Sequence, residues 1–113
     1  MFYKVIEEYS DIINNFSVSE FRKYGSAVSL VAKIEFINSS ILYIRDYLFL
    51  DGRRKYSYHW QNNDGSLISR WDNSPHHREI STFPHHKHLS EKIILSKELD
   101  IRDIFKTIKK EIK

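Results

Sequence analysis

Cysteine is absent from this chain, and glycine and proline are scarce, with three and two residues among 113. Without cysteine the protein has neither disulfides nor thiolate metal ligands, and secretion gains no support. So little glycine and proline, beside 41% hydrophobic and 14% aromatic residues, argues against disorder and indicates a compact fold. The length predicts a single domain over residues 1–113.

Long hydrophobic runs are missing as well. No apolar run approaches the roughly 20 residues that a membrane-spanning helix needs. The acids Glu7 and Glu8 distinguish the start of the chain from a secretory signal peptide. We therefore expect a cytoplasmic protein that does not bind a membrane.

The charge of the chain is moderately basic. The formal net charge is +3 with neutral histidines, and protonation of all six histidines would raise it to 3 + 6 = +9. A field of this sign favours an anionic partner whose binding depends on pH. The alternative is that the lysines and arginines form an ordinary solvated surface.

Hydrophobic periodicity predicts an α+β fold. An amphipathic helix runs to about Asn14, and a capped helix starts after Asp100; between them lies an antiparallel β-meander of four to five strands. Asp51-Gly52 and Asp64-Gly65 predict tight hairpin turns, because glycine adopts positive φ without strain. The expected strands cover residues 28–36, 41–50, 54–61, 67–72 and a last short segment at 93–95, with 20–24 as a short edge strand.

A histidine-rich loop is expected from residue 74 to about 89. All six histidines fall between His59 and His88, and five of them stand in two blocks, at 76–77 and 85–88. A long loop without secondary structure is uncommon in a compact domain unless it has a function. Imidazole donates, accepts and ligates near neutral pH, so this crowding indicates a site.

Three interpretations of the histidines stay open. As metal ligands, His86 and His88 could join His76 or His77 and Asp72 in an open site, although the spacing matches no standard zinc signature. As acid and base, His85, His86 and His88 offer what RNA cleavage without a cofactor or metal requires. As structural residues, they would bridge loop carbonyls.

A binding surface for RNA would surround these catalytic candidates. Arg45, Arg70 and Lys87 are the expected phosphate ligands, and Tyr47 or Tyr58 could stack a base or donate a proton. His59 is either a half-buried structural residue or, if Arg45 and Arg70 share its face of the sheet, part of a phosphate patch, which the strand register decides. The candidate substrate-binding residues are Arg45, Tyr47, Tyr58, His59, Arg70, His76, His77 and Lys87.

Four segments resemble a known family: YSYHWQ at 56–61, DG at 64–65, RWDNSPHH at 70–77 and TFPHHKH at 82–88. Together with the amphipathic start and the C-terminal helix, they make the chain similar to the TumE toxins of prokaryotic type II toxin–antitoxin modules. The resemblance implies a small α+β protein that a helix-turn-helix antitoxin neutralises by direct binding. Its general shape is expected to be similar to that of the RelE-like ribonucleases.

The function expected from these observations is a toxin that acts on RNA as a metal-free ribonuclease. The alternatives are a non-catalytic domain that binds nucleic acid or protein, and a metal-dependent hydrolase that uses the histidine cluster. A homodimer is also expected as an open alternative to the monomer, because a long strand such as 27–36 at the edge of a meander could pair with a second copy.

Overall fold

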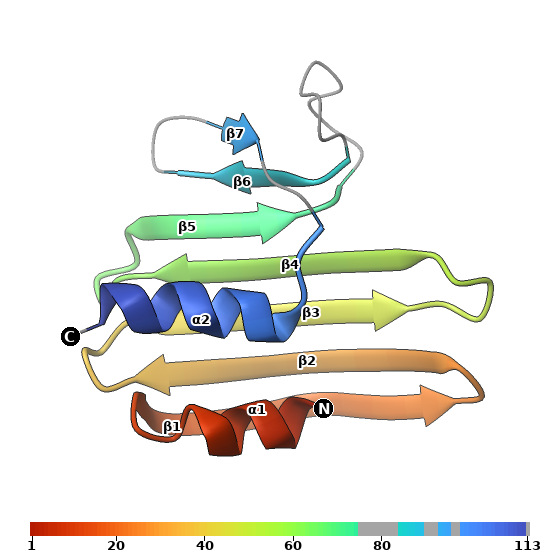
Figure 1. Cartoon of the computed structure of the whole chain (residues 1–113), viewed down its shortest axis with the longest axis horizontal. Helices are drawn as coiled ribbons and strands as arrows, with labels where there is room; N and C mark the ends of the chain where they lie inside the picture. Colours follow the sequence, from red (N-terminus) through yellow and green to blue (C-terminus); the bar gives the residue numbers. More distant parts are fainter. Residues whose placement is uncertain (75–83, 90–92, 96–97, 113) are drawn as a thin grey trace.

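One antiparallel sheet with both helices on the same face forms the molecule (Figure 1). The computed structural model describes residues 1–74, 84–89, 93–95 and 98–112, and the side chains at positions 86 and 93–95 lie outside this description. The elements are α1 (Phe2–Glu8), β1 (Ile13–Tyr24), β2 (Ala27–Phe36), β3 (Ile41–Leu48), β4 (Arg54–Gln61), β5 (Leu67–Asp72), β6 (His86–His88), β7 (Ile93–Leu95) and α2 (Ile101–Glu111).

Within the described residues the sheet has seven strands, each paired with the next one in sequence. The tight turns form as predicted, with φ of +88° at Gly52 and +90° at Gly65. In the first turn Oδ1 of Asp51 accepts from the Arg53 backbone N–H at 3.0 Å, which holds the turn closed. The α+β class and the meander are therefore confirmed, although the meander has more strands than the four to five expected.

The hydrophobic core lies between the sheet and the helices. Alternate residues of β2, β3 and β4 point into it, and α2 supplies one apolar stripe. Asp100 caps α2, as the sequence predicted, and the structure shows that it does so through a capping box with Asp103. The most deeply buried side chains of the core are those of Val5, Ile34, Phe36, Leu42, Ile44, Tyr58, Ile104, Phe105 and Ile108.

The first helix is shorter than expected, and the prediction that it runs to Asn14 is wrong. It ends at Glu8, and the residues from Ile13 onward form β1. Apolar residues at positions 13 and 16 have the three-residue spacing of a helix face, but the two asparagines between them are poor helix formers. Pairing along β2, from Ile13 opposite Phe36 to Tyr24 opposite Ala27, outweighs a local helix.

Two further corrections concern strands. The segment 74–89 is not a loop throughout, because His86–His88 pairs with β5 as strand β6. Strand β2 is not an edge, because β1 covers it along its length. The short strand at Ile93–Leu95 is confirmed as β7. No helix in the described part of the chain is long and apolar enough to cross a bilayer.

Candidate functional site

Polar and charged side chains gather on the sheet face opposite the helices. Strand register places Tyr43, His59, Arg70 and His88 in one row across β3, β4, β5 and β6. Residues opposite one another in neighbouring antiparallel strands share a face, and strands lie about 4.8 Å apart. His59 and His88 therefore flank Arg70 on either side. The register also places Arg45 on this face, which was the condition for the phosphate patch, while His59 itself is half-buried and hydrogen-bonded.

His59 is held as a neutral imidazole. Its Nδ1 lies 3.3 Å from Nη1 of Arg70, and its Nε2 lies 3.1 Å from Oε1 of Gln61. Arginine only donates, so Nδ1 accepts from Arg70 and the Nε2–H donates to Gln61. Burial, and then the charge of Arg70, lower the pKa of His59 below its ordinary value. His59 thus has the protonation state of a base.

A buried carboxylate organises the other side of the row. The side chain of Asp72 is 5% exposed, and its Oδ2 lies 3.0 Å from Nε of Arg70 and 3.2 Å from Nε2 of His88. Its Oδ1 accepts from the Ser74 backbone N–H at 3.2 Å and from Ser74 Oγ at 3.0 Å. Asp72 therefore orients both Arg70 and His88, and it would stabilise a positive charge on the imidazole.

A pocket of about 330 Å³ adjoins this row and extends it toward the start of β4. Arg45, Tyr47 and Lys55 line it together with Arg70 and Asp72. Across the described residues, the side chains of Arg45 and Lys55 have no hydrogen bond or ion pair with another residue. Two unpaired cations beside tyrosine rings are suited to phosphates with an adjacent base.

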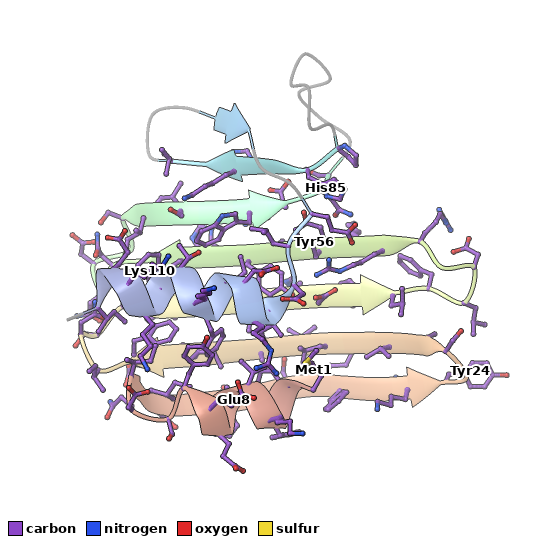
Figure 2. All side chains as sticks on the ribbon, viewed as in Figure 1. Met1, Glu8, Tyr24, Tyr56, His85 and Lys110 are labelled. Carbon is purple, nitrogen blue, oxygen red and sulfur yellow. The ribbon has the colours of Figure 1, made fainter. Side chains whose placement is uncertain are left out.

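The three predicted catalytic histidines are not brought together. His88 lies on the open face, whereas His85 lies on the helix side, where its Nδ1 is 2.8 Å from the Tyr56 hydroxyl and the two rings stack (Figure 2). Only the backbone of His86 is described, paired with Asp72. His76 and His77 lie outside the described residues.

Two predicted substrate-binding residues also lie on the helix side. Tyr58 is fully buried, and its hydroxyl donates to Asp46, so its expected place on the binding surface is corrected. Lys87 pairs with Trp71 in register, and its Nζ lies 5.0 Å from that ring. Period two accounts for the split, because neighbouring residues on a strand face opposite ways.

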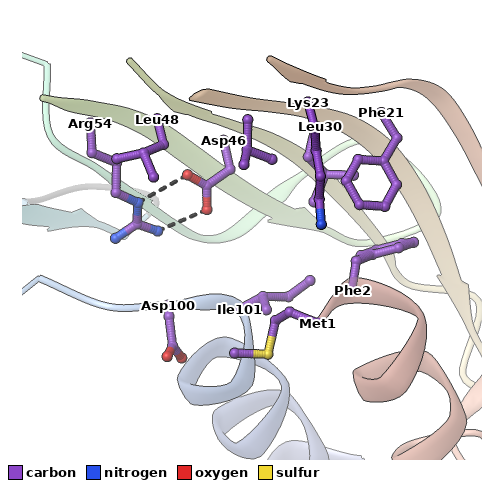
Figure 3. Close-up of a pocket in the computed structure, with 11 residues that line it drawn as sticks. Met1, Phe2, Phe21, Lys23, Leu30, Asp46, Leu48, Arg54, Asp100 and Ile101 are labelled. Atoms are coloured by element: carbon purple, nitrogen blue, oxygen red, sulfur yellow. Dashed lines mark hydrogen bonds and ion pairs between the residues drawn. The ribbon is translucent and has the colours of Figure 1, made fainter. Parts of the chain in front are cut away.

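Arg54 and Asp46 satisfy each other on the helix side. Arg54 forms two hydrogen bonds to Asp46, at 2.9 Å and 2.8 Å, at one end of a mainly apolar pocket of about 310 Å³ (Figure 3). Burial alone would lower the pKa of Arg54, but Asp46 raises it. Burial, and then Asp46, raise the pKa of Tyr58, while burial raises that of Tyr56 to about 12. These phenols stay protonated, so this cluster is structural.

Sequence reasoning missed three members of the open-face site, which are Tyr43, Lys55 and Asp72 in its positioning role. Lys55 alternates with the buried residues of β4, and this pattern could have predicted that its side chain lies on the open face. Asp72 was considered only as a metal ligand, and its contact with His88 depends on the pairing of β5 with β6. No group of three or more potential metal ligands occurs among the residues that the structure describes.

A small α+β protein with a basic, histidine-bearing sheet face is the class that the fold and the site define. A family model described as "Toxin TumE" matches residues 2–113. The chain therefore belongs to the TumE family of toxins, and the resemblance seen in the sequence is confirmed. The comparisons with curated proteins and with solved structures found no match.

Proposed function

We propose that this toxin acts on RNA and cleaves it without a metal ion, through the row formed by His59, Arg70 and His88. The observation that carries the proposal is the register of this row, in which two imidazoles of different environment flank one guanidinium. Acid and base on opposite sides of a phosphate are what RNA cleavage by the neighbouring 2′-hydroxyl requires. In this proposal His59 takes the place of His85 as the base, whereas His88 keeps its predicted catalytic role and Arg70 keeps its predicted role as a phosphate ligand.

The proposed reaction is an internal transfer. His59 Nδ1 takes the proton of the 2′-hydroxyl as its oxygen bonds to phosphorus. His88 gives a proton to the 5′-oxygen as the bond from phosphorus to that oxygen breaks. The products are a 2′,3′-cyclic phosphate and a 5′-hydroxyl end, with no co-reactant. Arg70 offsets the charge on the phosphorane, and its move to the phosphate would free Nδ1 of His59.

RNA would reach this row over the adjacent pocket. Arg45 and Lys55 are exposed, and both lie on the same side of the row, where they supply charge for phosphates next to the scissile bond. Tyr43, 39% exposed, and the half-buried Tyr47 supply ring faces on which bases stack. The proposed setting is the cytoplasm, and the proposed protein partner is a helix-turn-helix antitoxin that binds the toxin directly.

The test is incubation of purified protein with end-labelled RNA in excess chelator, beside the variants His59→Gln, His88→Gln and Arg70→Gln. General acid or base catalysis contributes about 10²- to 10⁴-fold, so each histidine variant should lose cleavage by at least about 100-fold. His85→Gln is the matched control and should retain cleavage, because His85 lies on the helix side. Mass spectrometry should find the cyclic phosphate.

Each contrary result would overturn a different part of the proposal. Cleavage that appears only when a divalent metal is added would support a metal-dependent hydrolase. RNA binding without any product would support a non-catalytic binding domain. Cleavage that survives in both His59→Gln and His88→Gln would remove these two residues from the mechanism.

A further inference from the structure

Strand β1 leaves one edge of the sheet open. It pairs with β2 on one side, and no described strand pairs with its other side. Register shifts interrupt it between Ile13 and Asn15 and between Val18 and Glu20, whereas Glu20 to Tyr24 is regular. A regular, exposed edge is a template for another strand. The free part of the edge is therefore the segment 20–24.

Hairpin geometry determines which backbone groups of this segment are free. Tyr24 pairs with Ala27 across a two-residue turn in which Gly25 has φ of +58°. The pair that closes such a turn is hydrogen-bonded, and hydrogen-bonded pairs alternate along an antiparallel ladder. Arg22 therefore bonds to β2, whereas the N–H and C=O of Phe21 and Lys23 point to the open edge.

The side chains of this segment carry charges of both signs in a defined order. Glu20 and Arg22 lie on the open sheet face, and neither forms an ion pair with a described residue. Phe21 is 38% exposed on the helix side, near Tyr3, and Figure 3 shows it with Lys23 above Phe2. The segment thus has an exposed ring between an acid and a base.

We propose that β1 pairs with β1 of a second copy of this chain, antiparallel about a two-fold axis at Phe21. In this register the two copies of Phe21 face each other and exchange both backbone hydrogen bonds. Glu20 of each copy lies opposite Arg22 of the other, so two cross-strand ion pairs form. The segment is thus its own complement in backbone hydrogen bonding and in charge.

Charge selects this register over its neighbours. An axis at Glu20 would place the two copies of Glu20 opposite each other. An axis at Arg22 would place the two copies of Arg22 opposite each other. Like charges directly opposite destabilise a strand pair. A register that differs by a single residue is excluded as well. It would place the open face of one copy on the same side as the helix face of the other.

The dimer has a geometric consequence for the open face. A two-fold axis perpendicular to the sheet keeps both open faces on the same side, so the pair forms one continuous surface. Figure 1 shows α1 over the part of β1 near Ile13, away from the Tyr24 end. In each copy the N-terminal end of α1, where Tyr3 contacts Phe21, would lie near the axis, and the rest of the helix would extend away from it. The proposal depends only on β1 and not on RNA cleavage.

The first test is a charge exchange measured by sedimentation equilibrium over a concentration series. The native chain should reach twice its 13.6 kDa mass. Arg22→Glu and Glu20→Arg should each be monomeric, and the double variant should dimerise again because the opposite charges are restored. Circular dichroism checks that each variant folds. A monomeric native chain, single variants that still dimerise, or a double variant that stays monomeric would each overturn the proposal.

A second test does not need the charge variants to fold. The chain has no cysteine, so Glu20→Cys and Arg22→Cys can be mixed and oxidised. These positions form a non-hydrogen-bonded pair across the proposed axis, with Cα atoms about 4.5 Å apart, which fits a disulfide. The mixture should give a crosslinked dimer, whereas Arg22→Cys mixed with Ile37→Cys should not. No crosslink in the first mixture would overturn the proposal.

Discussion

Nε2 of His88 lies 3.2 Å from Oδ2 of Asp72, a carboxylate at the end of β5 whose side chain is 5% exposed. The same oxygen accepts from Nε of Arg70. One buried acid therefore positions two of the three side chains in the proposed catalytic row. Because Asp72 joins β5 to β6 and also orients the proposed catalytic side chains, its loss should affect both folding stability and cleavage.

Asp72→Asn is expected to lower both stability and cleavage. The amide keeps the size of the side chain but removes the charge that Arg70 and His88 face, so unfolding should require about 2 kcal/mol less free energy. Cleavage should fall because His88 loses its orienting group. Urea unfolding and the RNA assay measure the two effects. Asp64→Asn, in an exposed turn, is the control; equal stability of both variants would contradict this role.

Asp46→Ala is expected to destabilise the fold far more than Asp51→Ala. Asp46 forms a bidentate pair with the mostly buried Arg54 and accepts from the buried Tyr58, so its removal leaves two groups without their partner. The expected loss is about 3 kcal/mol. The pair between Asp51 and Arg53 is exposed to solvent, so its loss should destabilise the fold much less. Urea unfolding compares them, and similar losses would contradict the structural cluster.

Two tyrosines are expected to resist alkaline titration. Burial raises the pKa of Tyr56 to about 12, and the pKa of Tyr58 is raised as well, from an ordinary value of 10. Because the folded pKa lies above the unfolded value, the stability from the protonated phenols is complete below pH 10 and declines as pH rises toward 12. Absorbance of phenolate should therefore rise further when the chain unfolds at pH 11. Tyr56→Phe should reduce that extra rise, and an unchanged rise would contradict the prediction.

His59 is expected to titrate below its ordinary pKa of 6.5, because burial, and then the charge of Arg70, disfavour the imidazolium. The unfolded chain then binds a proton that the folded chain does not, so below about pH 6.5 this residue lowers stability as the pH falls. Histidine NMR spectra over a pH series measure the titration directly. Arg70→Gln should move it upward. A midpoint at or above 6.5 in the native chain would contradict the proposed base.

Local pattern accounts for much of the fold. The Asp-Gly turns, the alternation of Tyr56, Tyr58 and Trp60 in β4, and the capped stripe of α2 were predictable because each depends on residues adjacent in sequence. Family membership was also predictable from the sequence, and the family model matches residues 2–113. The first helix was predicted too long because the pairing partner that forms β1 lies further along the chain.

Only the tertiary structure decided the membership of the site. The sequence by itself placed five histidines in one segment, but a strand sends neighbouring side chains to opposite faces, so β6 separates Lys87 from His88. Register across β4, β5 and β6 then joined His59, Arg70 and His88, which lie 29 positions apart from first to last. Local sequence determines which residues alternate; long-range hydrogen bonding determines which of them meet.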